Sequence, residues 1–315
     1  MKNINIELLD KLPFLEDEGV SFLGSHKWLK TQFIIYESHF RILVATNNQN
    51  TIVAWLPLWS DNKKIFKRIA TLPLQPSGGP YFKKIDSTHF NKSLHFKENI
   101  QNAFFKFLNK RFERLTLSPE DNMVRAYPHS SIKVKHTLLT TLTHKENWPS
   151  DTKRFIKKAI KNGYQITDYS SIEEVLFKKI YNDVFSRKAL NTHFDSEAYK
   201  LWNSPENPLR SYILKNNNSE TIGFFAWAED CTHKKCTLIF SSILDNAMKN
   251  GAQYLIYDFI LNHAPLGYTF DFAGADDIGV SYLKEHFATQ LTQRFLIESR
   301  GGSTIQKSIL NILKK

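Results

Sequence analysis

The segment RILVATNNQNTIVAW, residues Arg41–Trp55, is similar to a second segment, SYILKNNNSETIGFF, residues Ser211–Phe225. Each is a run of β-forming residues, an Asn-rich turn and a second β-forming run, which is typical of an antiparallel hairpin. A gapless alignment places Asn47 on Asn217. The pair indicates an internal repeat, although Asn-rich hairpins also recur by chance.

The elements expected after the two hairpins follow the same order, a strand, a helix and a strand. We expect them over Ile65–Leu74, Glu98–Lys110 and Arg114–Ser118 in the first copy, and over Cys236–Leu244, Ala252–His263 and Tyr268–Phe272 in the second. Because this order departs from strict βαβα alternation, it predicts an α/β fold with a mixed sheet and helices on both faces. The shared order favours duplication over chance.

The length of 315 residues agrees with two domains of about 150 residues each. Between the copies, Pro149 to Thr152 supply a turn and candidate helix N-caps. We therefore predict a first domain over residues 1–146, a second over 147–302, and a separate amphipathic helix over 303–315.

The composition bounds the class of protein. Hydrophobic residues form 42% of the chain, which is enough for packed cores, and the net charge of +11 favours phosphate-rich partners or anionic surfaces. The longest apolar stretch, Thr51–Trp59, is shorter than the roughly 18 residues of a membrane helix. No secretory signal is recognisable at the start, so we expect a cytoplasmic protein without a transmembrane segment. Cys231 and Cys236 lack a second cysteine pair for a zinc site, so no metal is expected.

A basic helix is predicted over Lys153–Asn162, with an apolar stripe on one side and five cationic residues on the other. Arg154 and Lys157 belong to this cationic side, which contains no acid to pair with them. Such a surface suits phosphate, and a solvated face near acids from elsewhere in the fold is an equal alternative.

Several short segments resemble, in order along nearly the whole chain, the motifs of the FemABX and FemAB-like acetyltransferases, a branch of the GNAT superfamily. They are SHKWL (Ser25–Leu29), IVAWLPL (Ile52–Leu58), QPSGGP (Gln75–Pro80), RFIKKA (Arg154–Ala159), Phe185–Arg187, FDFAG (Phe270–Gly274) and GVSYLKEHF (Gly279–Phe287). The chain departs from the family at Ala273, Leu283 and Ala288, where the family has Gly, often Phe, and Gly. These departures put the family's exact substrate in doubt.

The resemblance implies two tandem GNAT-like domains, with the tail at 303–315 packing on the first. It also implies an enzyme that transfers an aminoacyl or acyl group to an amine. In FemABX proteins the donor is an aminoacyl-tRNA, and the acceptor is a nucleotide-linked or lipid-linked peptidoglycan precursor. Other relatives use acyl-CoA, so the donor stays open between these two, and no tightly bound cofactor is expected.

The same resemblance suggests the site residues. Lys284 matches a family lysine and would bring positive charge to the reacting carbonyl or to a carrier phosphate, whereas by itself it would be read as a surface lysine. Asp271 interrupts an apolar strand, and we expect it to organise the site more than to accept a proton. Arg187 matches a phosphate-binding arginine, with a stabilising position at a helix C-terminus as the alternative.

Three residues of the first copy complete the predicted set. Lys30 lies near the position of a family phosphate-binding lysine, although the spacing is not reproduced cleanly. Gly78 and Gly79 would let backbone amides approach a ligand, and a tight turn is their more common use.

The chemistry expected is a direct attack of an amine on an acyl carbonyl, because no G-x-S-x-G nucleophile motif is present. Neither cysteine is excluded as a nucleophile by sequence. The pyrophosphate-binding loop typical of acyl-CoA users is also missing at Asn246–Gln253, which disfavours a standard CoA site.

Three functions follow, in this order of preference. The first is a FemABX-like transferase that uses aminoacyl-tRNA. The second is an acyl-CoA-dependent N-acyltransferase acting on an amino sugar or another small amine. The third is a non-catalytic duplicated GNAT protein that binds RNA or an anionic polymer.

Overall fold

The computed structural model describes residues 4–61, 67–84, 90–120, 130–142, 148–187, 196–276 and 278–301. The chain forms two compact units, one over Met1–Lys135 with Gln293–Lys315 and one over His136–Thr292. Each unit is an α/β structure built on a mixed sheet, as the sequence predicts.

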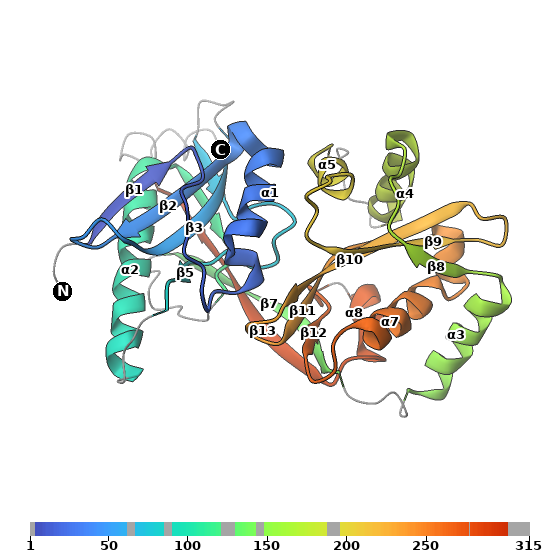
Figure 1. Cartoon of the computed structure of the whole chain (residues 1–315). Coiled ribbons are helices and arrows are strands. Elements are labelled where there is room, and N and C mark those ends of the chain that lie inside the picture. The colour runs from blue at the N-terminus through green and yellow to red at the C-terminus, as the bar shows by residue number, and fades with distance from the viewer. Residues whose placement is uncertain are drawn as a thin grey trace, which may run out of the picture. The chain divides into compact units, whose positions relative to one another are not determined.

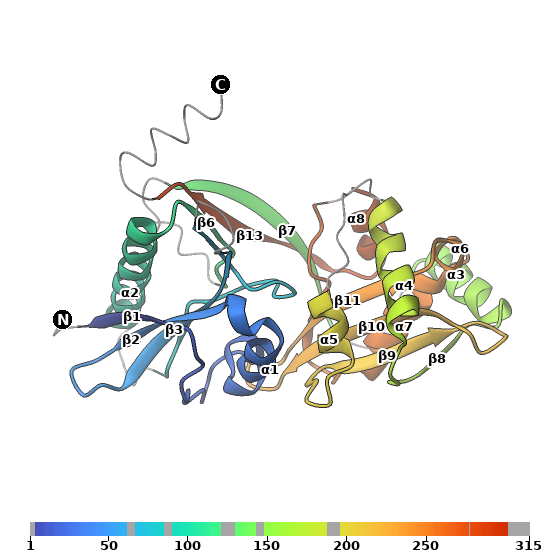
Figure 2. The same ribbon diagram turned by 90° about the horizontal axis from the view of Figure 1, so that it is seen from above.

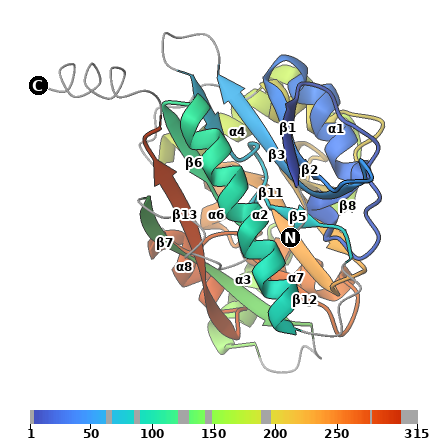
Figure 3. The same ribbon diagram turned by 90° about the vertical axis from the view of Figure 1, so that its left-hand side faces the viewer.

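In the first unit the described residues form a mixed sheet and two main helices. In the order of the sheet, its strands are β1 (Asn5–Leu9), β2 (Phe40–Thr46), β3 (Ile52–Asp61), β4 (Arg68–Ala70), β6 (Arg114–Leu117) and β13 (Gln290–Ser299), with β5 (Tyr81–Phe82) paired to β3. Its helices are α1 (His26–Tyr36) and α2 (Phe90–Arg111), with short 3-10 helices at Phe22–Gly24 and Glu37–His39. Figure 3 shows α2 running along one face of these strands.

The second unit repeats this plan. In sheet order, its strands are β8 (Gln165–Asp168), β9 (Arg210–Lys215), β10 (Thr221–Asp230), β11 (Lys235–Ile243), β12 (Thr269–Asp271) and β7 (Ser131–Thr141). Its helices are α3 (Ser150–Lys161), α4 (Glu174–Arg187), α5 (Ser196–Trp202), α6 (Asp245–Lys249), α7 (Ala252–His263) and α8 (Ile278–Glu285). Figure 1 shows α4 and α5 on one side of the strands and α3, α7 and α8 on the other.

The two strand orders correspond element by element, which confirms the predicted duplication. Strands β1, β2, β3, β4 and β6 match β8, β9, β10, β11 and β12. In each unit the fourth and fifth of these strands are parallel to one another, and one long helix connects them, α2 in the first unit and α7 in the second.

The two repeats exchange their last strands. In each unit the last strand is the one that follows the other repeat in the chain. Strand β7 follows β6, yet pairs antiparallel with β12, and β13 follows α8, yet pairs antiparallel with β6. Both are the long strands, green and red, in Figure 2. The compact units therefore divide at 135/136 and 292/293, whereas the sequence suggested 146/147. The predicted tail helix, 303–315, lies outside the described residues.

The hairpins are confirmed, but the gapless alignment of their turns was wrong by one residue. Asn47 Oδ1 accepts hydrogen bonds from the amides of Gln49 and Thr51, at 2.9 and 3.0 Å. In the second hairpin the corresponding residue is Asn216 and not Asn217. Asn216 Oδ1 accepts hydrogen bonds from the amides of Asn218 and Glu220, at 3.0 and 2.9 Å.

The strand pairing follows the same one-residue shift. With Asn47 placed on Asn216, the pair Ala45–Ala54 falls on Leu214–Gly223, and the irregularity that follows it falls at the same point in both hairpins. The polar side chain that closes each turn, rather than the count of Asn residues, sets the register.

Local signals explain most of the element limits. Helix α7 spans Ala252–His263 as predicted, and its apolar residues join the second core, whereas β4 is shorter than the predicted Ile65–Leu74. Strand β10 reads as a nearly continuous apolar run because helices cover both of its faces. Phe224 stacks on Phe177 of α4 at 4.4 Å, and Phe225 packs edge-on against Phe259 of α7.

The equivalence of the turns predicts matched mutational effects. Asn47→Ala and Asn216→Ala should each lower the free energy of unfolding by about 1 kcal/mol, because each change removes the acceptor for two backbone amides. Asn217→Ala, the control suggested by the gapless alignment, should change it by less than about 0.5 kcal/mol. Chemical denaturation measures these values, and a larger loss at Asn217 than at Asn216 would contradict the assigned register.

Candidate active site

Strands β11 and β12 separate at the centre of the second unit. They pair in parallel only through Lys235–Thr269, Cys236–Phe270 and Thr237–Asp271. After Asp271 the chain follows β7 instead, because the Phe272 amide donates to Leu138 O at 3.0 Å. Among the residues that the structure describes, the part of β11 from Leu238 to Ser242 thus runs on beyond its pairing with β12.

A β-bulge lies at the start of this unpaired edge. Ala226 of β10 pairs with Phe240 and Trp227 pairs with Leu238, so Ile239 is an extra residue in β11. A bulge re-aims backbone groups and is common next to active sites. The unpaired edge and the bulge together offer backbone N–H and C=O groups to an extended ligand.

Asp271 ends β12 as a fully buried carboxylate with several donors. Its Oδ1 accepts from Thr137 Oγ1 at 2.6 Å and from the Ala273 amide at 2.9 Å. Its Oδ2 lies 3.2 Å from Nζ of Lys235. A buried charge with this many partners organises its surroundings, and a role of Asp271 in the reaction stays a prediction.

Lys284 of α8 is also buried, with 4% of its surface exposed. Its Nζ donates to the carbonyl oxygens of Phe272 and Gly274, at 2.7 and 2.6 Å, and more weakly to that of Ala273, at 3.4 Å. The ammonium group thus holds the loop that follows β12. Lys284 and Asp271 act on the same short loop from two sides.

This loop also explains one departure from the family motif. Ala273 and Gly274 both have left-handed backbone angles, with φ of 53° and 97°. The family has Gly at both positions, which fits this conformation without strain. Ala273 keeps it because Asp271 accepts its amide and Thr137 Oγ1 accepts the Gly274 amide at 3.2 Å.

The first unit closes the corresponding position with its own chain. After β4, the amide of Gly78 donates to Ser118 O at 2.7 Å, and the Ser118 amide donates to Thr71 Oγ1 at 2.8 Å. A Cβ on Gly78 would lie 2.4 Å from the Thr71 side chain. This glycine serves close packing, and its amide, which we expected to face a ligand, is used inside the protein. Gly79 has φ of 85° and lies in the same turn.

None of the predicted phosphate-binding cations belongs to this loop or to α8. Arg154 and Lys157 are exposed on α3, where Arg154 lies 3.2 Å from Asp151. Lys30 is exposed on α1 in the first unit. Arg187 is the last residue of α4, and its side chain lies outside the described residues.

Sequence reasoning missed two residues of this network, Thr137 and Lys235. Thr137 lies 134 positions from Asp271 in the sequence, so no local pattern connects them. Lys235 is visible in the sequence only as part of the turn before β11.

The two cysteines differ in their capacity for nucleophilic chemistry. Cys236 is fully buried, and burial raises the pKa of its thiol to about 12. Cys231 is exposed in the turn between β10 and β11. Since a thiolate is the nucleophile, Cys236 is unsuited to an acyl-enzyme mechanism.

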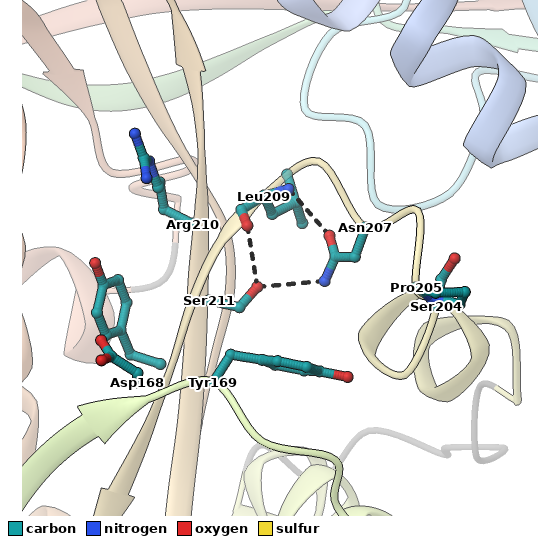
Figure 4. Close-up of a pocket in the computed structure, with 9 residues that line it drawn as sticks. Asp168, Tyr169, Ser204, Pro205, Asn207, Leu209, Arg210 and Ser211 are labelled. Carbon is teal, nitrogen blue, oxygen red and sulfur yellow. Dashed lines mark hydrogen bonds between the residues drawn. The ribbon is translucent and has the colours of Figure 1, made fainter.

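A pocket of about 350 Å³ lies where β8 ends and β9 begins (Figure 4). In it, Asn207 accepts from the Leu209 amide at 3.0 Å and donates to Ser211 Oγ at 3.3 Å, and Tyr169 lies beside them. Strands β9, β10 and β11 intervene between β8 and β12 in the sheet. The pocket contains none of the predicted site residues.

Within the described ranges, no group of three or more His, Cys, Asp or Glu side chains is placed to hold a metal ion. None of the helices in that part of the chain combines the length and apolar character of a membrane span.

The arrangement is that of a tandem GNAT fold. No protein-family model and no curated protein matches the sequence. The fold is similar to that of L-PGS from Bacillus licheniformis, with a TM-score of 0.56 and 12% identity over 91% of this chain and 96% of that one. FemX gives 0.53 at 10% identity, over 87% and 91%. The tandem GNAT protein of the clavulanic acid pathway gives 0.52 at 10% identity, over 96% and 100%. These likenesses confirm the predicted fold.

The carbonyl contacts of Lys284 predict a structural effect of its replacement. Lys284→Met should lower the free energy of unfolding by about 2 to 4 kcal/mol, because it leaves buried carbonyls without their charged donor. Lys157→Met, on an exposed face, should change it by less than about 0.5 kcal/mol. Equal stability of the two variants, measured by chemical denaturation, would show that the ammonium does not hold the loop.

The thiol environments predict selective alkylation. Iodoacetamide at pH 8 should label Cys231 and leave Cys236 unmodified in the folded protein, because Cys236 is buried and protonated. Mass spectrometry of tryptic peptides measures both sites, with urea-unfolded protein as the control in which both react. Rapid labelling of Cys236 in the folded protein would argue against its assigned inertness.

Proposed function

We propose that the protein is an N-acyltransferase that moves an aminoacyl group from tRNA to an amine of a cell-envelope precursor. The observation that carries the proposal is the unpaired edge of β11 beside the bulge at Ile239, set in a tandem GNAT fold. The predicted cytoplasmic location agrees with both substrates and stays a prediction.

The edge of β11 suits the acyl group because it presents backbone donors to a carbonyl. In the reaction the amine adds to the ester carbonyl, the new C–N bond forms and the C–O bond to the carrier breaks. One proton leaves the amine, and one is taken up by the departing hydroxyl. A fixed backbone N–H near Ile239 would stabilise the negative charge that develops on the carbonyl oxygen.

The predicted catalytic residues have positioning roles in this scheme. Lys284 and Asp271 fix the loop after β12, which begins where β12 and β11 separate. Hydrogen bonds that hold this loop would keep its backbone in place, as reactant alignment requires. Direct attack fits better than an acyl-enzyme because the buried Cys236 is protonated.

The basic face of α3 supports a polyanionic donor. Lys153, Arg154, Lys157, Lys158 and Lys161 are all exposed on this helix. Phosphate contacts of this kind give binding that weakens steeply with salt. A tRNA carries phosphates over a long surface, which suits a cationic helix better than a single small ligand does.

The acceptor side rests on the similar folds. FemX and L-PGS share the fold over most of the chain, and the FemABX resemblance implies a nucleotide-linked or lipid-linked muropeptide as the acceptor. We therefore place peptidoglycan precursors first among the amines to test.

The function is tested by incubating the full chain with a complete set of charged tRNAs and a nucleotide-linked muropeptide. Mass spectrometry should detect an acceptor that has gained one aminoacyl residue. Because replacement of Lys284 also destabilises the loop, folded-state controls by circular dichroism accompany that variant. No product with any aminoacyl group would overturn the proposal.

The role of α3 gives a second prediction. The double variant Lys157→Glu/Lys161→Glu should raise KM for aminoacyl-tRNA about 10-fold and reduce the salt dependence of binding. Lys106→Glu/Lys110→Glu, with the same change of charge on exposed positions of α2, is the matched control and should leave KM within about twofold. Equal effects of the two double variants on KM would mean that α3 acts only through the net charge of the protein and is not a specific binding surface for tRNA.

A further inference from the structure

The segment between β11 and α7 is where acyl-CoA users of the GNAT fold hold the donor's pyrophosphate with backbone amides. In this protein several amides of residues 244–251 already donate within the chain. Those of Leu244, Met248, Asn250 and Gly251 donate to backbone carbonyls at 3.0 to 3.1 Å. These amides do not fit a pyrophosphate, which needs donors that are free to turn toward it.

Another amide of this segment donates its hydrogen bond to a carboxylate. Asp183 of α4 accepts a hydrogen bond from the amide of Asp245, the first residue of α6, at 2.7 Å. An anion is favoured at this position because the amino end of a helix carries a partial positive charge. The protein therefore places its own carboxylate against the segment that holds the pyrophosphate in acyl-CoA users of this fold.

The lysines beside this segment are engaged as well. Lys249 Nζ lies 2.5 Å from Asp245 Oδ2, and Lys158 Nζ donates to Lys249 O at 3.2 Å. These contacts reduce the positive charge available to offset the repulsion between Asp183 and a bound pyrophosphate.

Helix α3 covers the start of α7 from the other side. Gly251 has φ of 87°, and a Cβ at this position would lie 2.4 Å from the carbonyl oxygen of Phe155. The Phe155 ring stacks on Tyr254 with centroids 4.7 Å apart. The amino end of α7 thus faces a backbone acceptor and an aromatic ring of α3, which leaves little room for an anion.

We infer that Asp183 is a specificity-determining residue that excludes donors with a pyrophosphate at this loop, coenzyme A above all. The cleft then accepts acyl esters whose phosphates lie elsewhere, such as an aminoacyl group on a ribose hydroxyl of RNA. This inference rests on the proposed acyl transfer and names the donor class that its cleft selects.

Titration calorimetry of the full chain with coenzyme A tests the role of Asp183. The wild-type protein should show no binding at millimolar coenzyme A. Asp183→Ser removes the carboxylate and frees the Asp245 amide, so it should bind at least 10-fold more tightly than the wild type. Asp183→Asn keeps an acceptor without the charge and should fall between them. Glu174→Gln, an exposed position on the same helix, is the control for the loss of one negative charge.

Two results would overturn the inference. One is micromolar binding of coenzyme A by the wild type. The other is that the wild type and the Asp183→Ser variant have the same affinity for coenzyme A, or that neither binds it. Circular dichroism checks that the variant is folded. Because binding is measured without turnover, these results are distinct from failure of the proposed reaction, which would appear as absence of product with every charged tRNA.

Discussion

The second unit depends on a buried hydrogen bond from Thr137 to Asp271, with 2.6 Å between the two oxygen atoms. This bond holds the end of β12 against β7, and the chain after Asp271 then follows β7 instead of β11. The separation of β11 from β12 is the consequence. Two lysines add positive charge: buried Lys284 donates to carbonyl oxygens of the loop after β12, and partly exposed Lys235 pairs with Asp271.

The two repeats show how one fold takes two forms. Strand β4 is short, and the loop after it binds the end of β6 through Gly78 and Ser118. Strand β11 is longer and continues past the end of β12. Among the described residues, the first repeat thus ties the chain after β4 to the end of β6, whereas in the second repeat β11 continues beyond its pairing with β12.

Local features of the sequence predicted the parts of the fold that depend on local interactions. The hairpins and helix α7 followed from turn residues and apolar spacing. The exchange of β7 and β13 between units did not, because it depends on pairing between residues far apart in the chain. The candidate site shows the same limit: Asp271 and Lys284 carried a motif, whereas Thr137, the partner of Asp271, had no local signal. The one-residue error at Asn216 arose because side-chain hydrogen bonding sets the turn.

In the proposed reaction, the edge of β11 beyond its pairing with β12 receives the acyl donor. Hydrogen exchange measured by mass spectrometry, with and without a non-hydrolysable aminoacyl-RNA analogue, tests it most directly. We predict slower exchange of amides in Leu238–Ser242 when the analogue is bound, because the donor would pair with this edge. Bound analogue that protects other segments while leaving the exchange of Leu238–Ser242 unchanged would contradict the proposed donor site.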